Sequence, residues 1–194
     1  MKILAFAGSN NPQSINQQLA AYATGLLSEH GSTLINLRDY PMPLFSVEIL
    51  GKEGVPENSI LLFDEIQKYD AFIISIAENN RSVTAVFKNT IDWLSKSVKT
   101  NNPADTNVFR DKPVLLLSTS PGSVGASVAL ENATGTITQL GGNVVDKFSL
   151  PIFYQNTKID ADGFHIVNES MSAEFKSLIV RFENKLSERA TINH

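Results

Sequence analysis

The residues best suited to chemistry form one short segment, residues 8–16, which reads GSNNPQSIN. If a helix begins near the end of this segment, its first backbone N–H groups are free, and the helix dipole adds a field that attracts an anion. The hydroxyl and amide side chains could bind the same anion, or they could only cap the helix. The candidate binding residues are Ser9, Asn11, Ser14, Ile15 and Asn16.

Two common phosphate-binding motifs are absent from this segment. It has neither the GxGxxG pattern of dinucleotide-binding domains nor the GxxxxGKS or GxxxxGKT pattern of P-loop NTPases, which argues against both classes. A turn rich in serine and asparagine suits a terminal phosphate monoester better than a pyrophosphate. A phosphate site is favoured over a simple cap if the segment follows the first strand of a sheet.

Composition excludes several other chemistries. The 194 residues include no cysteine, so disulfides, thiolate metal sites and cysteine nucleophiles are ruled out. The three histidines lie far apart, and we expect neither a metal site nor a catalytic side chain. The net charge of −4 argues against a nucleic-acid partner. The first apolar run, residues 3–7, is too short for a signal sequence or a membrane span, so we expect a cytoplasmic protein.

Short apolar runs alternate with longer amphipathic stretches along the whole chain. The runs predict strands buried on both faces, and the longer stretches predict helices. The predicted strands are 3–7, 33–37, 71–76, 114–118 and 144–148, and the predicted helices are 14–29, 59–68, 84–99, 125–140 and 172–187. Gly31 is the expected C-cap of the first helix. The long connections 38–58 and 150–169 resemble functional or oligomer-forming loops.

This alternation predicts an α/β fold with a three-layer, doubly wound parallel sheet. Five strands suit the flavodoxin-like order 2-1-3-4-5, in which ligands bind beyond the carboxyl ends of the strands, where the strand order reverses. The loops after the first, third and fourth strands should therefore form the site. Since no repeat or composition break occurs, we expect one domain over residues 1–194.

The loop after the third strand and the following helix carry the most specific pattern. Residues 77–95 read AENNRSVTAVFKNTIDWLS and resemble the PEYNxSxPxxLKNAIDWLS signature of the NADPH-dependent FMN reductases, a flavodoxin-like group that includes quinone, azo-dye and chromate reductases. The matching positions are Glu78, Asn80, Ser82, Lys88, Asn89, Ile91, Asp92, Trp93, Leu94 and Ser95. The first loop is similar to that family's GSxRxxSxN motif at Gly8, Ser9, Ser14 and Asn16.

The resemblance implies an FMN whose phosphate lies in the first loop and whose isoalloxazine ring lies between the loops after the third and fourth strands. Ser9, Ser14 and Asn16 would then hold the phosphate. The residues beside the ring would be Ala77, Glu78, Asn79, Asn80 and Arg81 on one side, and Ser118, Thr119, Ser120 and Gly122 on the other.

The resemblance also implies a reaction and an assembly. NAD(P)H would be the co-substrate, giving a hydride to FMN, and the electrons would pass to a quinone-like, azo or flavin acceptor. A homodimer or homotetramer is expected, with contacts that include the predicted helix 84–99 and the long loop before Ile60.

Several family positions differ in this chain. The arginine of the phosphate motif is Asn11, and the proline and tyrosine of the third loop are Ala77 and Asn79. Arg81 replaces a small residue, and it could supply the cation missing at Asn11, fill the place of the ring, or be solvated. Two other functions therefore stay open: a non-enzymatic FMN electron carrier, and a binding module that has lost its flavin.

Overall fold

A five-stranded parallel sheet forms the centre of the structure, a computed structural model that describes residues 1–98, 105–161 and 163–192. The strands of this sheet are β1 (Lys2–Ala7), β2 (Gly31–Leu34), β3 (Ala71–Ile76), β6 (Pro113–Thr119) and β7 (Asn143–Leu150). They lie in the order β2-β1-β3-β6-β7, and every neighbouring pair is parallel. This is the flavodoxin-like order 2-1-3-4-5, so the predicted fold class is confirmed.

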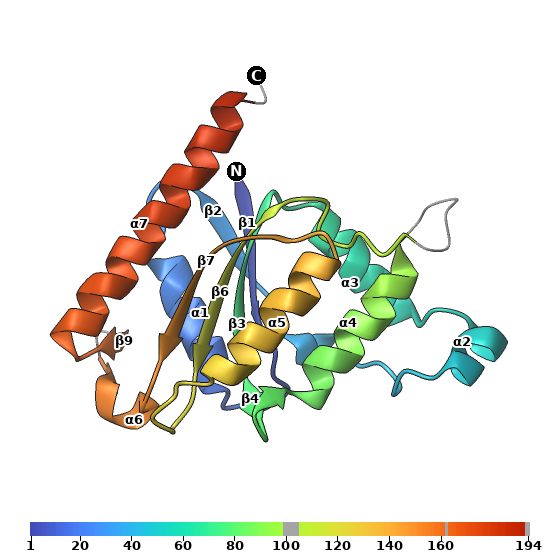
Figure 1. Ribbon diagram of the computed structural model, residues 1–194, viewed down its shortest axis with the longest axis horizontal. Coiled ribbons are helices and arrows are strands. Elements are labelled where there is room, and N and C mark those ends of the chain that lie inside the picture. Colours follow the sequence, from blue (N-terminus) through green and yellow to red (C-terminus); the bar gives the residue numbers. More distant parts are fainter. Residues whose placement is uncertain (99–104, 162, 193–194) are drawn as a thin grey trace.

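Helices cover both faces of this sheet and complete three layers (Figure 1). One face carries α1 (Ile15–Gly25) and α7 (Glu169–Ile192), and the other carries α3 (Glu57–Gln67), α4 (Ala85–Ser97) and α5 (Ser127–Gln139). Successive residues of a strand point to opposite faces, so each central strand contributes to two cores. In β1, Ile3 and Ala5 belong to the core under α1 and α7, whereas Leu4 and Phe6 belong to the other.

The edge strand β2 differs from the prediction of a buried strand at 33–37. It spans Gly31–Leu34 and all four residues are exposed, because β2 lies at the edge of the sheet and pairs only with β1. The first predicted helix is also too long, since α1 ends at Gly25 and Leu26 is its C-cap. Gly31 begins β2 and does not cap α1, so that prediction is wrong.

A buried carboxylate explains why α1 ends early. Glu183 of α7 accepts hydrogen bonds from the backbone N–H groups of Ser28 and Glu29, at 2.9 and 2.8 Å, and from the Ser28 hydroxyl at 3.1 Å. These bonds hold the residues between α1 and β2 in a turn against α7. A contact with a residue so distant in sequence could not be read from the local pattern.

The long connections contain short elements that were not predicted. The first holds a 3-10 turn, η1 (Leu37–Asp39), and the helix α2 (Val47–Glu53), which projects from the body of the molecule (Figure 1). The second holds α6 (Phe153–Asn156) and an antiparallel hairpin of β8 (Thr157–Asp160) and β9 (Gly163–Ile166). A smaller hairpin, β4 (Glu78–Asn79) with β5 (Ser82–Val83), follows β3.

The remaining helices occur where they were predicted, with shifted ends. α3 begins two residues before the predicted 59, and α5 begins two residues after the predicted 125. Thr84 is the N-cap of α4, and the last residue of the predicted helix 84–99 lies outside the described residues. α7 extends beyond the predicted 172–187 at both ends. No helix within the described ranges is long and apolar enough to cross a membrane.

Candidate functional site

A cavity of about 220 Å³ opens at the carboxyl ends of β1, β3 and β6. These strands are neighbours in the sheet, so the loops that follow them converge. The cavity is lined by Ser9, Asn10, Asn11, Ser14, Ile15, Asn16, Ala77, Glu78, Asn79, Thr84, Thr119, Ser120 and Pro121. Of the residues expected from the sequence, only Asn80, Arg81, Ser118 and Gly122 do not line it. Asn10 and Thr84 line it without having been predicted, although each lies in or beside a predicted loop.

The side chain of Asn16 joins the three loops. Its Nδ2 donates to the carbonyl oxygen of Thr119 at 3.0 Å, and its Oδ1 accepts from the Ser75 hydroxyl at 2.9 Å and from the Thr119 N–H at 3.1 Å. Asn16 is only 3% exposed. Oδ1 accepts twice and one of the two Nδ2 N–H groups donates within the protein, so a contact between Asn16 and a phosphate would come from its backbone N–H or from the second Nδ2 N–H.

The first turn of α1 presents donors to the cavity. The Ser14 Oγ caps the helix by accepting from the N–H of Gln17 at 3.2 Å, which leaves the Ser14 hydroxyl hydrogen available. Within the described residues, the backbone N–H groups of Ile15 and Asn16 have no protein acceptor. Free N–H groups and a serine hydroxyl at a helix N-terminus favour an anion. Ser14 can therefore cap the helix and contribute to an anion site at the same time.

The backbone of the first loop packs closely against α4. The Thr84 hydroxyl donates to the carbonyl oxygen of Gly8 at 2.7 Å and accepts from the N–H of Phe87 at 3.1 Å. A Cβ at position 8 would lie 2.9 Å from Cδ2 of Phe87, which is closer than side chains tolerate. Glycine is therefore required at position 8, and its absence of a side chain brings the first and third loops together.

The third loop turns through the β4–β5 hairpin. Its two turn residues, Asn80 and Arg81, have positive φ values of 52° and 61°, which match the tight type I′ turn of two-residue hairpins. Asparagine tolerates this conformation well, whereas arginine is disfavoured there. Arg81 is exposed and its side chain does not line the cavity. Its guanidinium therefore does not fill the cavity in this structure.

Glu78 introduces the one carboxylate of the cavity lining. Its Oε2 accepts a hydrogen bond from the N–H of Ala129, in the first turn of α5, at 3.1 Å. α5 has no side-chain cap at its own N-cap residue, Ala126, so Glu78 supplies one from another loop. The positive end of the helix dipole also stabilises this negative charge. A phosphate in the first loop would therefore be stabilised by the N-terminus of α1, and the Glu78 carboxylate is stabilised by the N-terminus of α5.

The fourth loop is held by its own polar side chains. The Ser118 hydroxyl donates to the carbonyl oxygen of Gly125 at 2.8 Å, and the Thr119 hydroxyl donates to that of Leu150 at 2.7 Å. The Gly122 carbonyl oxygen accepts from the N–H groups of Gly125 and Ile152. Ser118 and Gly122 thus shape this loop from behind, while Thr119 and Ser120 line the cavity.

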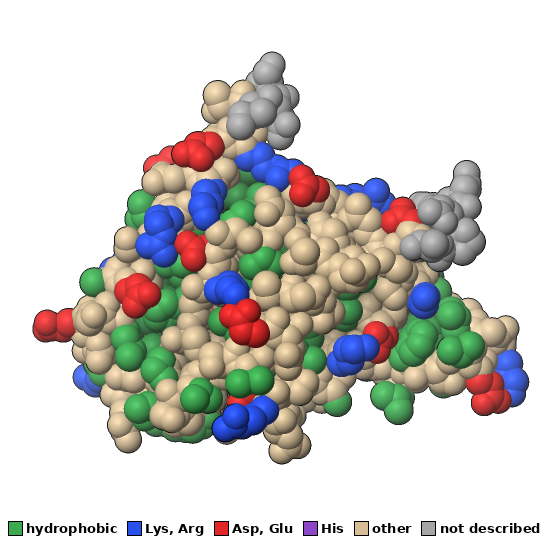
Figure 2. Space-filling model, in the orientation of Figure 1, with side chains coloured by type: hydrophobic (Ala, Val, Ile, Leu, Met, Phe, Trp, Pro, Cys, Tyr) green, Lys and Arg blue, Asp and Glu red, His purple; other side chains and the backbone are tan. Residues whose placement is uncertain are grey.

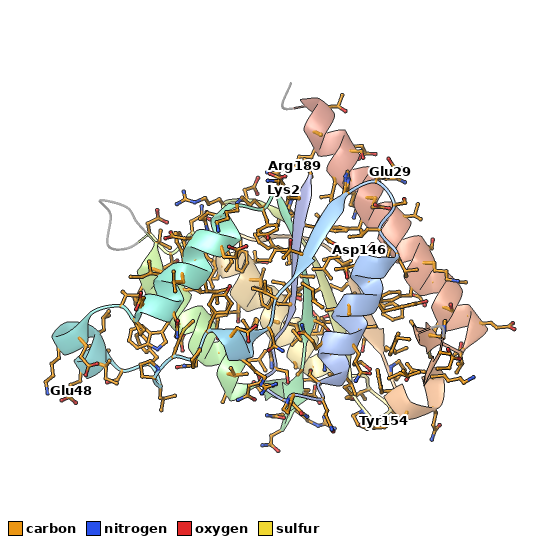
Figure 3. The ribbon with its side chains drawn as sticks, turned by 180° about the vertical axis from the view of Figure 1, so that it is seen from behind. Lys2, Glu29, Glu48, Asp146, Tyr154 and Arg189 are labelled. Carbon is orange, nitrogen blue, oxygen red and sulfur yellow. The ribbon has the colours of Figure 1, made fainter. Side chains whose placement is uncertain are left out.

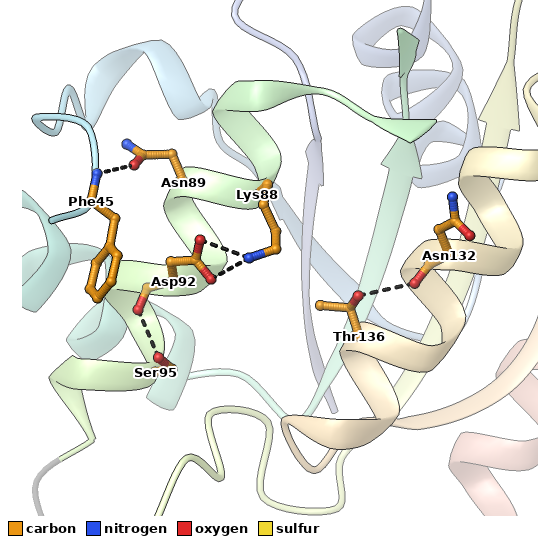
Figure 4. Close-up of polar contacts among 7 residues, drawn as sticks. All are labelled: Phe45, Lys88, Asn89, Asp92, Ser95, Asn132 and Thr136. Atoms are coloured by element: carbon orange, nitrogen blue, oxygen red, sulfur yellow. Dashed lines mark hydrogen bonds and ion pairs between the residues drawn. The ribbon is translucent and has the colours of Figure 1, made fainter. Parts of the chain in front are cut away.

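The helix that carries the family signature supports the long arm formed by residues 40–56. Asn89 Oδ1 accepts from the N–H of Phe45 at 2.7 Å (Figure 4), and its Nδ2 donates to the Pro43 carbonyl oxygen. The Trp93 indole N–H donates to the same oxygen at 2.8 Å, and its ring meets Phe45 edge-on at 4.9 Å. Lys88 and Asp92 form a surface ion pair on the same helix. These signature residues therefore position the arm and do not line the cavity.

A second hollow of about 350 Å³ adjoins the cavity, because Asn10 borders both. Its lining also includes Arg38, Tyr40 and Asn89. Burial raises the pKa of the Tyr40 hydroxyl above its ordinary value, and the nearby Glu65 and Asp39 carboxylates raise it further. Tyr40 therefore stays protonated at neutral pH and can donate a hydrogen bond. Among the described residues, no group of three or more acidic or histidine side chains could hold a metal ion.

The sheet order defines a flavodoxin-like fold, with a cavity at the carboxyl ends of its central strands. A family model described as NADPH-dependent FMN reductase matches residues 1–155, and the chain belongs to this family.

Individual relatives agree with this assignment. A 2-hydroxy-1,4-benzoquinone reductase of a Burkholderia species is 29% identical over 170 residues, which cover 87% of each chain. An NAD(P)H-dependent FMN reductase of Pseudomonas aeruginosa is 27% identical over 164 residues, covering 84% of this chain and 83% of that one. The solved structure of an NAD(P)H:(acceptor) oxidoreductase from Paracoccus denitrificans has the same fold, with a TM-score of 0.73 and 22% identity over 96% of this chain and 97% of that one.

Replacing Asn16 by Ala should lower the free energy of unfolding by more than about 2 kcal/mol, because each buried polar group left without a partner costs about 1–3 kcal/mol. The measurement is denaturant unfolding without added flavin. Asn11→Ala is the control, since exposed Asn11 makes only a local bond to the N–H of Gln13 and its loss should cost about 1 kcal/mol or less. Equal losses in the two variants would contradict the structural role of Asn16.

Proposed function

We propose that this protein is an NAD(P)H-dependent flavin oxidoreductase that binds FMN in the cavity at the ends of β1, β3 and β6. The observation that carries the proposal is the anion site of the first loop, where the free N–H groups of Ile15 and Asn16 lie beside the Ser14 hydroxyl. The family match supports the flavin and the nicotinamide co-substrate. The names of the Burkholderia and Pseudomonas relatives support a quinone-like or flavin acceptor, and an azo acceptor stays within the proposal.

The residues of the cavity fit the phosphate end of FMN. Ser9, Ser14 and the backbone of residues 15–16 would hold the phosphate, and Asn11 would add its amide N–H₂. The backbone of residues 77–79 and 119–120 would lie beside the ring, with Asn80, Arg81, Ser118 and Gly122 shaping those loops. When bound, FMN supplies hydride acceptance from the nicotinamide and onward electron transfer. The chain's own part is to hold, orient and shield the reactants, so a catalytic acid or base is not required.

The first test is spectroscopic. We expect the purified protein to bind FMN with one-to-one stoichiometry, more tightly than FAD, and to bleach the oxidised flavin absorbance when NADPH or NADH is added. Continued oxidation of the nicotinamide with a benzoquinone present would establish the enzyme. Flavin binding without nicotinamide oxidation would indicate an electron carrier, and a protein that ignores added FMN would indicate a module that has lost flavin; either result contradicts the proposal.

Replacing both Ser9 and Ser14 by Ala should weaken FMN binding by tenfold or more, because hydrogen bonds to a charged group contribute about 1.5–3 kcal/mol each. Titration of flavin fluorescence measures this affinity. The fold should survive, since a lost helix cap costs about 1 kcal/mol.

Asn11→Arg is the opposite change at the same loop. It restores the cation of the family motif and should tighten FMN binding by about tenfold through a charge-assisted bond. Unchanged affinity in both the serine variant and Asn11→Arg would place the phosphate elsewhere.

We further propose that the chain acts as one domain, in the cytoplasm where NAD(P)H is available, and that it forms a homodimer through α4 and the arm. The arm exposes large apolar side chains, with Leu44 78% and Val47 76% exposed. Figure 2 shows hydrophobic side chains gathered at the end of the molecule that carries this arm. Such exposure on a segment that Asn89 and Trp93 hold in place suits a protein interface.

Sedimentation velocity at micromolar concentration should show a dimer or a dimer of dimers. The double change Leu44→Glu with Val47→Glu should shift it to monomer, because charges at a buried apolar interface are strongly unfavourable. Val180→Glu is the control, since Val180 is 56% exposed on α7, on the opposite face of the sheet. A monomeric wild-type protein would refute the assembly.

A further inference from the structure

A groove separate from the flavin cavity lies between α1 and the β8–β9 hairpin. It has a volume of about 670 Å³, and its lining includes Gln18, Tyr22, Leu26, Ile159, Phe164 and Lys176. No residue of this lining also lines the proposed flavin cavity. The hairpin and Lys176 also lie beyond residues 1–155, which match the family. The groove is thus a distinct feature of the molecule. Figure 3 shows α1 and α7 side by side on this face, with Tyr154 near the start of α1.

The shape of the groove suits a planar ring. Its floor is formed by the small residues Ala21 and Gly25 of α1, and a Cβ at Gly25 would meet no atom within 4 Å. The aromatic rings of Tyr22 and Phe164 form a wall, with centroids 5.0 Å apart. Ile159 is 63% exposed on the hairpin side. A flat aromatic ligand can cover these apolar surfaces and pack against the aromatic wall.

Two polar groups at the groove have no partner among the described residues. The Oε1 atom of Gln18 is shielded from solvent and, within the described residues, accepts no hydrogen bond. An acceptor in this state costs about 1–3 kcal/mol, which a turn of the Gln18 side chain toward a donor in the groove would recover. The ammonium group of Lys176 is exposed and has no acidic partner among the residues the structure describes. His165, by contrast, is already bonded to Asp160 at 3.2 Å.

We propose that this groove binds a small phenolic carboxylate, that is, a planar aromatic acid that carries a hydroxyl group. The ring would lie over Gly25 against Tyr22 and Phe164, and the carboxylate would pair with Lys176. The Gln18 side chain would turn so that its Oε1 accepts from the ligand hydroxyl. The alternative is that a second copy of the chain covers the groove. An apolar interface of that kind does not require the free Lys176 ammonium and the unpartnered Gln18 oxygen at its borders. The proposal does not depend on the proposed flavin chemistry, because the two sites share no residue.

The direct test is calorimetric titration of the full chain with 4-hydroxybenzoate, with and without saturating FMN. We expect one-to-one binding that FMN does not change. Methyl 4-hydroxybenzoate lacks the charge and benzoate lacks the donor, so each should bind at least fivefold more weakly. Competition with FMN would place the acid in the flavin cavity and overturn the proposal, as would equal affinity for the three compounds.

Two pairs of variants locate the binding site. Gly25→Leu fills the groove and should abolish binding, whereas Gly135→Leu on exposed α5, where a Cβ also meets nothing within 4 Å, should leave it unchanged. Lys176→Gln should weaken binding by about tenfold, and Lys185→Gln, on the same helix but bonded to the Val145 carbonyl oxygen, should not. Binding that survives Gly25→Leu refutes the proposal. If Gly25→Leu instead changes the sedimentation of the protein and no acid binds, the groove is an interface between copies of the chain.

Discussion

The candidate site depends on a single buried amide. Asn16 bonds to Ser75 at the end of β3 and to the backbone of Thr119 at the end of β6, and it lies in the first turn of α1. Parallel strands that end side by side do not by themselves fix the loops that follow them. An asparagine can do so because one side of its amide donates and the other accepts. Once Asn16 is in place, the N–H groups of the α1 N-terminus face the cavity between the three loops.

Two further sets of contacts complete the surroundings of the site. Gly8 and Thr84 bring the first loop against α4, and Glu78 joins the third loop to the N-terminus of α5. Asn89 and Trp93 of α4 then hold the arm. The most specific sequence motif in the chain therefore acts mostly on architecture. It fixes the position of the helix relative to the third loop and the arm. The surface ion pair Lys88–Asp92 within the motif adds only about 0.3–0.5 kcal/mol to the stability of the fold.

Sequence alone predicted what depends on local pattern and missed what depends on distant contacts. β3 was predicted because a short apolar run of this length is typical of a strand covered on both faces. The alternation of five such strands with helices predicted the sheet order. β2 was misplaced because an exposed edge strand lacks that pattern, and Glu183, far along the chain, ends α1 early. The cavity lining was largely foreseen from the loop positions, whereas the structural use of the Asn16 amide and the turn position of Arg81 were not. Both are tertiary properties that a residue type does not reveal.

The charge balance of the site bears on how the proposed flavin would be held. The residues that line the cavity include no lysine or arginine, and Asn11 stands where the family motif has arginine. Arg81 lies exposed in the hairpin turn and does not line the cavity. A phosphate would therefore be bound by N–H groups, the Ser9 and Ser14 hydroxyls and the α1 dipole, which together attract it less than a bidentate cation does. Weaker binding of FMN suits a reductase whose flavin arrives and leaves as a substrate. Asn11, in place of the arginine, is then the residue that would favour exchange of FMN over tight binding.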